Sequence, residues 1–294
     1  MLSITIERRG DGADDVHVHG AGQGVWAARM AAELGGHPVL CGFAGGEPAA
    51  MLESLLNGGR CDLRLVRTAS PSGVYVMDRR DGERRLIAAS LSGAATRHEV
   101  DDLVSATIAA AMDARVLSLC APYPSETIDA APFAEIAADA RAVGAEVHVD
   151  LGPPLLDAAL RGRPALVKIN DWQAAEYVVG PVDTTERLHA AAQRMIDAGA
   201  ERVVITRGGE PALALLGDEA LWIVPPDCPA GAREGCGDTM MGALAAARAQ
   251  GMGWHDALRL GAAAGAANFL RRGLGTGRRQ DVEALLGHVE LRRV

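Results

Sequence analysis

Short apolar runs alternate with longer amphipathic stretches from about residue 104 to the C-terminal third of the chain. The apolar runs have the length and composition of strands buried on both faces. We expect such strands at 115–119, 146–150, 165–168 and 202–206. Between them, 125–143 and 184–198 predict helices. This alternation favours an α/β fold with a mostly parallel sheet, helices on both faces and ligands at the carboxyl ends of the strands.

The first hundred residues follow another pattern. Apolar and polar residues alternate at 16–19, and 73–89 predicts two strands joined at Asp81-Gly82, a strong hairpin turn signal. Helices are expected at 25–34 and 49–56. The N-terminal region therefore mixes a hairpin with helices instead of continuing the strand–helix alternation.

Composition narrows the class of protein. With 294 residues that are 49% hydrophobic, the chain can bury a sizeable core, and we expect one domain over 1–294. A net charge of −9 argues against nucleic-acid and membrane-surface partners. The five cysteines show no C-x-x-C spacing, and neither a signal peptide nor a membrane span is recognisable. These features predict a reduced, cytoplasmic protein.

The sequence Gly235-Cys236-Gly237-Asp238, directly before the apolar run 240–247, predicts a glycine-rich turn at a helix N-terminus. Backbone N–H groups and the helix dipole make such a turn an anion site. Asp238 could then accept a hydroxyl proton while the amides hold a phosphoryl group, which is a phosphotransfer layout. The alternative is an ordinary N-cap Asp after a flexible turn. A helix N-terminus could also lower the pKa of Cys236 and permit redox chemistry.

Further segments match known proteins in order and spacing. With the Gly-Cys-Gly-Asp turn, they resemble the ribokinase-like (PfkB) carbohydrate kinases, most closely the phosphofructokinase branch. The matching segments are 20–29, 166–170, 203–209 and 262–268. The resemblance implies a three-layer α/β/α fold with a small β lid, which we place at 11–19 and 73–90. It also implies ATP and Mg²⁺ as cofactors and a small sugar or sugar phosphate as partner, and it is compatible with a homodimer joined through the lid.

For the nucleotide, the resemblance implies a set of five binding residues: Asn170, Thr206, Gly208, Gly209 and Asn268. An ordinary turn at 206–209 and a satisfied helix-interior Asn268 remain open alternatives. The family motif Asn-x-x-Glu, whose Glu holds magnesium through water, has Gln173 in place of Glu. No direct metal ligand is therefore predicted, and Glu176, one turn further on, either substitutes or is an ordinary exposed residue.

For the sugar, the resemblance implies Gly22, Gln23 and Gly24, where glycines let the backbone approach substrate hydroxyls. The family's Lys and Asn at this motif are replaced by Gln23 and Trp26, and no Asp precedes Asp11 on the first strand. The sugar-recognition set is thus altered.

Arginines provide candidate ligands for a substrate phosphate. Arg29 is one by resemblance, and Arg84 is one of four arginines that flank the Asp81-Gly82 turn, together with Arg79, Arg80 and Arg85. An exposed, edge-protecting hairpin is the alternative, which we favour for two of the four. His17 and His19 are interpreted as a polar strand face, and Asp150 as the cap of a turn.

We therefore expect an ATP-dependent kinase that phosphorylates a hydroxyl of a sugar or sugar phosphate resembling fructose 1-phosphate. A P-loop kinase is excluded, because Gly-x4-Gly-Lys-Ser/Thr does not occur. Two alternatives stay open. One is a catalytically impaired ligand-binding member of the same fold, suggested by Gln23, Trp26 and Gln173. The other is a nucleoside or small-alcohol kinase, in which Trp26 stacks on a planar ring.

Overall fold

The computed structural model describes residues 1–57, 61–228, 231, 233–271 and 277–294. Its main sheet has seven strands in the order β13-β12-β11-β10-β9-β8-β7. The strands are β7 (Val116–Cys120), β8 (Glu146–Asp150), β9 (Leu166–Asn170), β10 (Arg202–Arg207), β11 (Glu210–Leu216), β12 (Glu219–Val224) and β13 (Glu290–Arg293). Pairing is parallel from β7 to β10 and antiparallel from β10 to β13. The four strands expected from the apolar runs are β7 to β10, each within two residues of its predicted bounds.

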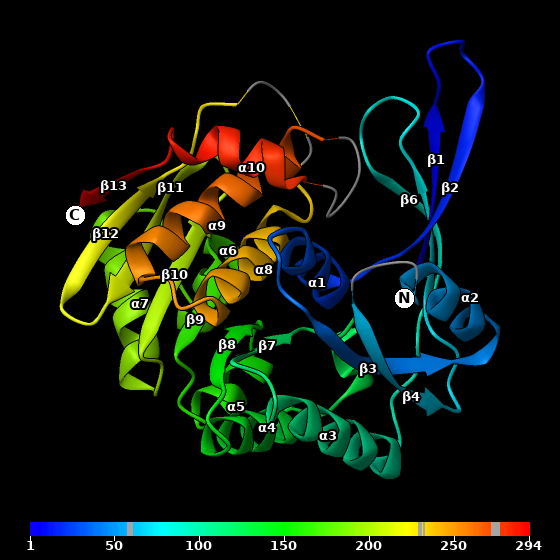
Figure 1. Ribbon diagram of the computed structural model, residues 1–294, viewed down its shortest axis with the longest axis horizontal. Helices are drawn as coiled ribbons and strands as arrows, with labels where there is room; N and C mark the ends of the chain where they lie inside the picture. Colours follow the sequence, from blue (N-terminus) through cyan, green and yellow to red (C-terminus); the bar gives the residue numbers. More distant parts are fainter. Residues whose placement is uncertain (58–60, 229–230, 232, 272–276) are drawn as a thin grey trace.

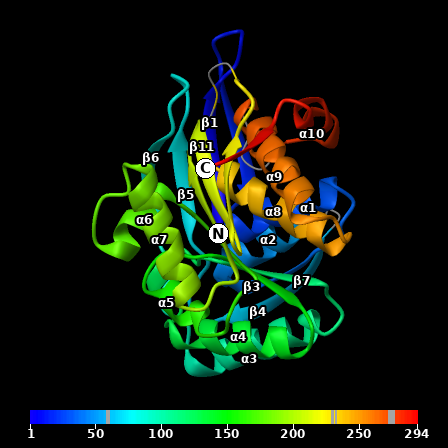
Figure 2. The same ribbon diagram turned by 90° about the vertical axis from the view of Figure 1, so that its left-hand side faces the viewer.

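Helices cover both faces of this sheet (Figures 1 and 2). One face carries α1 (Gln23–Glu33), α8 (Cys236–Ala249), α9 (Trp254–Phe269) and α10 (Arg279–Leu286). The other carries α4 (Ala131–Ala142), α5 (Leu155–Leu160), α6 (Asp171–Val178) and α7 (Thr185–Asp197). The predicted α/β class with helix, sheet and helix layers is confirmed.

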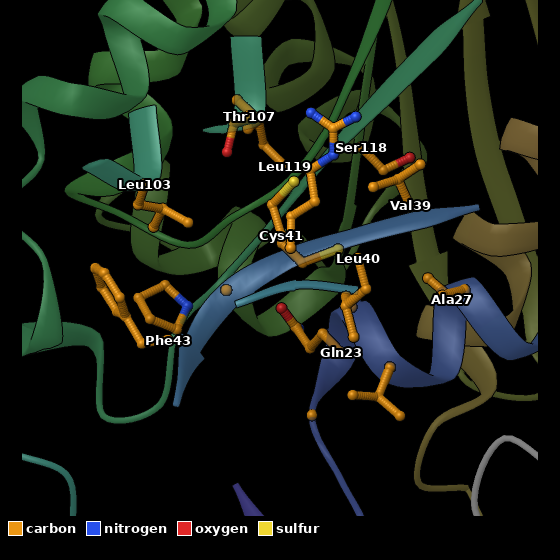
Figure 3. A pocket seen from close by; sticks show the side chains of 18 of the residues that line it. Gln23, Ala27, Val39, Leu40, Cys41, Phe43, Leu103, Thr107, Ser118 and Leu119 are labelled. Atoms are coloured by element: carbon orange, nitrogen blue, oxygen red, sulfur yellow. The ribbon is translucent and has the colours of Figure 1, made fainter. Parts of the chain in front are cut away.

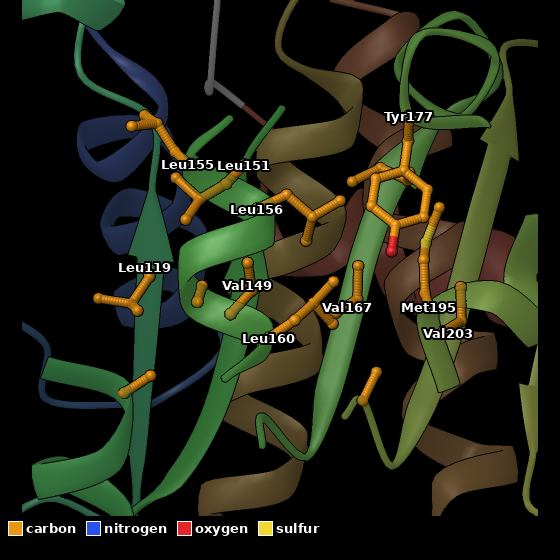
Figure 4. Close-up of a cluster of buried hydrophobic side chains, with 14 of the residues drawn as sticks. Leu119, Val149, Leu151, Leu155, Leu156, Leu160, Val167, Tyr177, Met195 and Val203 are labelled. Carbon is orange, nitrogen blue, oxygen red and sulfur yellow. The ribbon is translucent and has the colours of Figure 1, made fainter. Parts of the chain in front are cut away.

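The apolar sequence of strand β10 follows from its position between two helix layers. Val203 and Ile205 belong to the buried cluster beneath α4 to α7, whereas Val204 belongs to the cluster beneath α8 and α9. Side chains alternate along a strand, so a strand between two helix layers buries all of them. Figure 4 shows the first cluster, in which Val203 lies beside Val167 and Met195.

A four-stranded sheet, here called the lid sheet, stands to one side of the main sheet (Figure 1). Its order is β2-β1-β5-β6, with β1 (Leu2–Arg8), β2 (Asp14–Gly20), β5 (Val74–Asp78) and β6 (Arg85–Ser90). The predicted lid ranges, 11–19 and 73–90, contain β5 and β6 and all of β2 except Gly20. Strand β1, which pairs with β2 and β5, was not predicted. The assignment of 1–294 to a single domain stays a prediction.

A third, two-stranded sheet joins β3 (Val39–Gly45) to β4 (Asp62–Thr68) in parallel. The helices α2 (Gly46–Asn57) and α3 (Arg97–Ala111) lie close to it. Neither β3 nor β4 pairs with the main sheet in the described part of the chain.

One predicted helix is shorter than expected. The range 125–143 contains a 3₁₀ turn, η1 (Ser125–Thr127), and α4 begins only at Ala131. Pro132 explains the start, because proline is tolerated in the first turn of a helix but not in its interior. Among the described helices, none combines the length and apolarity needed to cross a membrane.

Candidate active site

Three charged side chains meet where β8 and β9 end and α8 begins. The Lys168 ammonium, on β9, forms an ion pair with Asp150 Oδ2 at the end of β8. Both side chains are buried, and Asp238 in the first turn of α8 interacts electrostatically with both. The strand ends and the helix N-terminus therefore assemble a buried Asp–Lys–Asp cluster, which we call the acidic triad.

The cluster changes the pKa of the Asp238 carboxyl. Burial and the neighbouring Asp150 charge raise the pKa of Asp238 to about 7, against the opposing effect of Lys168. Burial alone would lower the pKa of Lys168, but the charges of Asp150 and Asp238 outweigh it and hold that pKa above its usual value. Lys168 is thus an ammonium, and Asp238 exchanges its proton near neutral pH, which suits a general base.

The turn before Asp238 has the geometry of an anion site. Gly235 is the N-cap of α8 with φ +76°, a left-handed conformation that favours glycine. A Cβ on Gly237 would lie only 2.9 Å from Lys168 Nζ, so the backbone here approaches the ammonium closely. The first N–H groups of α8 have no intrahelical partner, and together with Lys168 they favour a bound anion.

Neighbouring side chains support this turn. Asn268 Nδ2, buried on α9, donates to the Glu234 carbonyl at 3.0 Å and to Cys236 Sγ at 3.6 Å. Burial raises the pKa of Cys236 to about 11, only partly offset by Asn268. Desolvation of the thiolate thus outweighs any lowering of this pKa by the helix N-terminus, so the possibility of redox chemistry at Cys236 loses its basis.

The predicted nucleotide residues on β9 and β10 lie side by side. Thr206 is the register partner of Asn170, and its hydroxyl donates to the Ile169 carbonyl at 3.3 Å. Gly208 and Gly209 are exposed in the following turn, where Gly208 has φ +62°. A Cβ on Gly208 would lie 4.0 Å from Arg233 Nη1, close to the anion turn.

Gln173 has a structural partner. Its Oε1 accepts the Asn170 N–H at 3.1 Å, while Asn170 Oδ1 accepts the Gln173 N–H at 2.9 Å, which is a capping box at the start of α6. Glu176 is exposed on α6, and its carboxylate makes no hydrogen bond or ion pair with the described residues.

The predicted sugar motif lies at the start of α1. Gly22 is its N-cap with φ +128°, Gly24 packs near Leu40, and Gln23 Oε1 accepts the Ala121 N–H at 2.7 Å. Trp26 is buried in a small apolar cluster. Its ring is therefore not available to stack on a substrate, which removes the observation behind the nucleoside-kinase alternative.

Two of the predicted phosphate ligands converge. The half-buried His19 at the end of β2 has its pKa lowered to about 4 by burial first, then by the charges of Arg29 and Arg84. Burial likewise lowers the pKa of Arg29 and of Arg84. Neither guanidinium makes a hydrogen bond or ion pair with another described residue. Arg29 and Arg84, with His19 beside them, form what we call the arginine cluster.

The other hairpin arginines have acidic partners. Arg85 pairs with Asp81 at 2.6 Å and is 65% exposed, and Arg80 pairs with Asp78 at 2.8 Å. Arg79 lies 3.5 Å from Glu7 and is inward-facing, with 12% of its side chain exposed. Arg80 and Arg85 are therefore the surface arginines of the hairpin.

Sequence reasoning missed three residues. It took Asp150 for a turn cap, did not single out Lys168, and placed His19 on a polar face. The structure instead pairs Asp150 with Lys168 and places His19 beside Arg29 and Arg84. A lysine inside a strand buried on both faces was the available signal, because a buried ammonium needs a counter-charge.

A carboxyl with a near-neutral pKa beside a glycine-rich helix N-terminus is an arrangement that suits phosphoryl transfer. The profile of the "pfkB family carbohydrate kinase" matches residues 4–281. The chain belongs to this family and is a sugar kinase. It is 28% identical over 250 residues to a 1-phosphofructokinase of Rhodobacter capsulatus, covering 84% of this chain and 78% of that protein. It is 26% identical over 256 residues to ATP-dependent 6-phosphofructokinase isozyme 2 of Escherichia coli, with 86% and 82% covered.

Solved structures agree on the fold. The tetrameric inhibited form of phosphofructokinase-2 from Escherichia coli superposes with a TM-score of 0.86 at 23% identity, covering 97% of this chain and 95% of that one. Arabidopsis thaliana ribokinase, complexed with ribose and ATP, gives 0.76 at 18% identity, with 97% and 95% covered. The predicted ribokinase-like fold is confirmed.

Proposed function

We propose that this sugar kinase transfers the γ-phosphoryl group of ATP to a hydroxyl of a sugar phosphate resembling fructose 1-phosphate, with Asp238 as the base. The observation that carries this proposal is the position of Asp238, whose pKa is about 7, at the N-terminus of α8 beside Lys168. A base with this pKa is partly ionised at neutral pH and still strong enough to accept a hydroxyl proton.

The transfer step follows from these positions. Asp238 accepts the proton of the substrate hydroxyl while the hydroxyl oxygen forms a bond to the γ-phosphorus. The bond from that phosphorus to the β,γ-bridging oxygen breaks, and ADP is released. The backbone N–H groups of Gly235 to Asp238 and the Lys168 ammonium stabilise the negative charge on the phosphoryl oxygens. Asn170, Thr206, Gly208, Gly209 and Asn268 are proposed to lie along the nucleotide.

The arginine cluster supports the proposal of a phosphorylated acceptor. Arg29 and Arg84 come from α1 and the lid hairpin, and both charges lie close enough to His19 to lower its pKa. Among the described residues, Arg29 has no acidic partner and Arg84 has only the more distant Glu234. Two such guanidinium groups suit a phosphate monoester. The phosphofructokinase relatives make a fructose phosphate the proposed substrate.

Magnesium fits the site only in part. The phosphate-binding groups are present, but Gln173 adds no charge and its Oε1 already accepts the Asn170 N–H. When bound with the nucleotide, the ion would neutralise phosphate charge and keep most of its ligands from phosphate and water. Glu176 is exposed and is not proposed as a ligand.

Steady-state kinetics on purified protein test the function. We expect turnover with ATP and fructose 1-phosphate or fructose 6-phosphate, and at least tenfold lower kcat/KM with free fructose or adenosine. Tight ATP binding without turnover on any sugar would instead support the ligand-binding alternative, which the altered Gln23 and Gln173 motivate.

We also propose a homodimer that forms through the lid sheet, because one face of this sheet carries exposed apolar side chains. Ile4, Ile6, Val16, Val18 and Val76 share that face by strand register, and Val16 is 59% exposed. The opposite face carries the buried Ser3 and Thr5 together with His19, the register partner of Ser3. An exposed apolar sheet face is typical of a subunit interface. Analytical ultracentrifugation should show a dimer that Val18→Lys dissociates, whereas Met112→Lys, on an exposed α3 end, leaves it intact.

A further inference from the structure

Strand β8 carries polar residues on one face, although it lies between two helix layers. Its sequence, Glu146-Val147-His148-Val149-Asp150, alternates polar and apolar residues. Val147 and Val149 belong to the buried cluster beneath α4 to α7. Side chains alternate along a strand, so the three polar residues face the helix layer that contains α8. Asp150, at the end of the strand, belongs to the acidic triad, and Glu146 lies at the other end.

The polar residues near the start of β8 hold the C-terminal end of α8. Arg248, in the last turn of α8, donates from Nε and Nη2 to the two oxygens of the Glu146 carboxylate, at 2.9 and 2.8 Å. His148 is fully buried, and its Nε2 lies 2.8 Å from the same carboxylate. The guanidinium also lies over the Trp254 ring of α9, 4.4 Å from its centre. We call Glu146, His148 and Arg248 the helix anchor.

The helix anchor keeps its charges at neutral pH. Burial alone would raise the pKa of Glu146, but hydrogen bonds from His148 and Arg248 hold it at about 2. Burial lowers the pKa of His148, so its imidazole is neutral and Nε2 donates its proton to the carboxylate. The ion pair of Glu146 with Arg248 is therefore present throughout the pH range in which Asp238 titrates.

Helix α8 runs antiparallel to β8 and is attached to it near both ends. The helix from Asp238 to Arg248 is about 15 Å long, and the strand from Glu146 to Asp150 is about 13 Å long. The acidic triad and the helix anchor are thus two ionic contacts between the same two elements. Two separated contacts fix both the direction of a rigid helix and its position along its axis.

Packing constrains the C-terminal half of α8 only weakly. Between 245 and 249, Arg248 is the one residue with a side chain longer than that of alanine. Small residues of α8 line a cavity of about 750 Å³: Gly242, Ala245, Ala246 and Ala249. Figure 3 shows this cavity from close by, with Ala27 of α1 and Leu119 of β7 beside it. Small side chains next to open space interlock little with their neighbours, so the axial position of α8 depends on its ionic contacts.

We propose that Arg248 is a positioning residue for phosphoryl transfer, which holds α8 on β8 through Glu146 and thereby fixes Asp238 against the reacting hydroxyl. Arg248 acts through the helix and touches neither the nucleotide nor the sugar. This inference rests on the proposed role of Asp238 as the base. Without the helix anchor, α8 can shift along β8, and a displacement of about 1 Å in a catalytic group can lower a rate about 100-fold.

The first test replaces Arg248 by methionine, which removes the charge and keeps an unbranched side chain beside Trp254. In Arg248→Met, kcat should fall about tenfold or more, while KM for ATP and for the sugar phosphate stays within about twofold. Steady-state kinetics measure both quantities. A shape-filling role alone would leave kcat intact.

The second readout is the pKa of Asp238, which does not require turnover. Asp150, Lys168 and the Cys120 thiol of β7 face this carboxyl, and burial with the Asp150 charge raises its pKa from 3.8 to about 7. A shift of α8 moves Asp238 out of these surroundings, so in Arg248→Met its pKa should fall towards 3.8. NMR titration of ¹³C-labelled aspartate carboxyls, with the Asp238 signal assigned from Asp238→Asn, measures this pKa.

Matched variants separate positioning from general stability. Arg141→Met removes an ion pair with Glu201 at the same edge of the sheet but in the other helix layer, and should leave kcat and the Asp238 pKa unchanged. Glu146→Gln keeps the size of the side chain and tests the anchor if Arg248→Met fails to fold. Combining Glu146→Met with Arg248→Met should restore Tm but not kcat, because an apolar contact has no preferred direction.

The outcomes distinguish this inference from the proposed function. An unmoved pKa of Asp238 in Arg248→Met and Glu146→Gln overturns the inference, and so do equal losses of kcat in Arg141→Met. A return of kcat together with Tm in the double variant overturns it as well. If the wild-type protein turns over no sugar, the proposed function fails, and the pKa of Asp238 alone decides whether the anchor positions α8.

Discussion

The two proposed ends of the candidate site, here called the phosphate end and the acceptor end, are built from different parts of the fold. At the phosphate end, β8, β9 and the first turn of α8 hold Asp150, Lys168 and Asp238 in one buried cluster. At the acceptor end, Arg29 comes from α1, whereas His19 and Arg84 come from the lid sheet and its hairpin, and all three are only half-buried.

This difference separates what the chemistry requires from what the substrate requires. Phosphoryl transfer needs a base and an anion site held within fractions of an ångström, which rigid strand ends and helix termini provide. Recognition of the acceptor can change through loops and a lid without disturbing that frame. Two departures from the family pattern, Gln23 and Trp26, lie at the acceptor end, and a third, Gln173, lies at the phosphate end.

The largest expected effect is at the phosphate end. Asp238→Asn should lower kcat by about 10²- to 10⁴-fold, because the amide cannot accept the hydroxyl proton, while ATP binding is retained. Steady-state kinetics and calorimetric ATP titration measure the two quantities. Near wild-type turnover on an accepted sugar phosphate would show that Asp238 is not the base.

Stability measurements distinguish loss of the base from damage to the fold. The folded protein raises the pKa of Asp238 from 3.8 to about 7, so it favours the protonated carboxyl. The raised pKa therefore adds to the free energy of unfolding. This stabilisation is fully present below about pH 4 and is lost as the pH rises through 7. Asp238→Asn has no such titration, so its Tm at pH 8 should equal or exceed that of wild type.

Lys168 is the next test of the phosphate end. Lys168→Met leaves Asp150 and Asp238 buried without their cation, so the pKa of Asp238 rises further and the acidic limb of the kcat/KM profile moves to higher pH. Unfolding free energy should fall by about 3–5 kcal/mol. Adding Asp150→Asn should restore much of that stability. An unmoved acidic limb would contradict the electrostatic link between Lys168 and Asp238.

At the acceptor end, neighbouring arginines provide a matched pair of variants. Arg84→Ala should raise KM for the phosphosugar by about 10- to 100-fold, since a charge-assisted contact contributes about 1.5–3 kcal/mol. Arg85→Ala, which removes only surface ion pairs with Asp81 and Glu83, should leave KM unchanged. KM for ATP should stay constant in both. Equal effects of the two substitutions would show that the hairpin does not discriminate the substrate phosphate.

The phosphate end was largely predictable from sequence because its positions follow from regular elements. Apolar runs located β7 to β10, and the Gly-Cys-Gly-Asp turn located the start of α8. The ion pair of Asp150 with Lys168 depends on which strands are neighbours, and a sequence pattern specifies this only through the topology. Strand β1 has the alternating sequence Leu2-Ser3-Ile4-Thr5-Ile6, which is typical of a strand with one buried face. The predicted lid did not include this segment.

The acceptor end was less predictable for a physical reason. Four arginines flank one turn, and their direction depends on the hairpin register, in which a shift of one residue reverses every side chain. The structure has a register shift between Val76 and Met77, just before these arginines. Sequence spacing alone therefore could not separate the less exposed Arg79 and Arg84 from the more exposed Arg80 and Arg85.

The smallest expected effect concerns the magnesium-linked position at the phosphate end. In Gln173→Glu, the carboxylate can still accept the Asn170 N–H, so the capping box survives and folding should be unaffected. The added charge should lower the magnesium concentration for half-maximal activity several-fold if it holds a water on the ion. Glu176→Gln, on the exposed side of the same helix, is the matched control and should leave the magnesium titration unchanged. If Gln173→Glu gives the wild-type curve, the start of α6 does not act on the ion, and magnesium is held by phosphate and water alone.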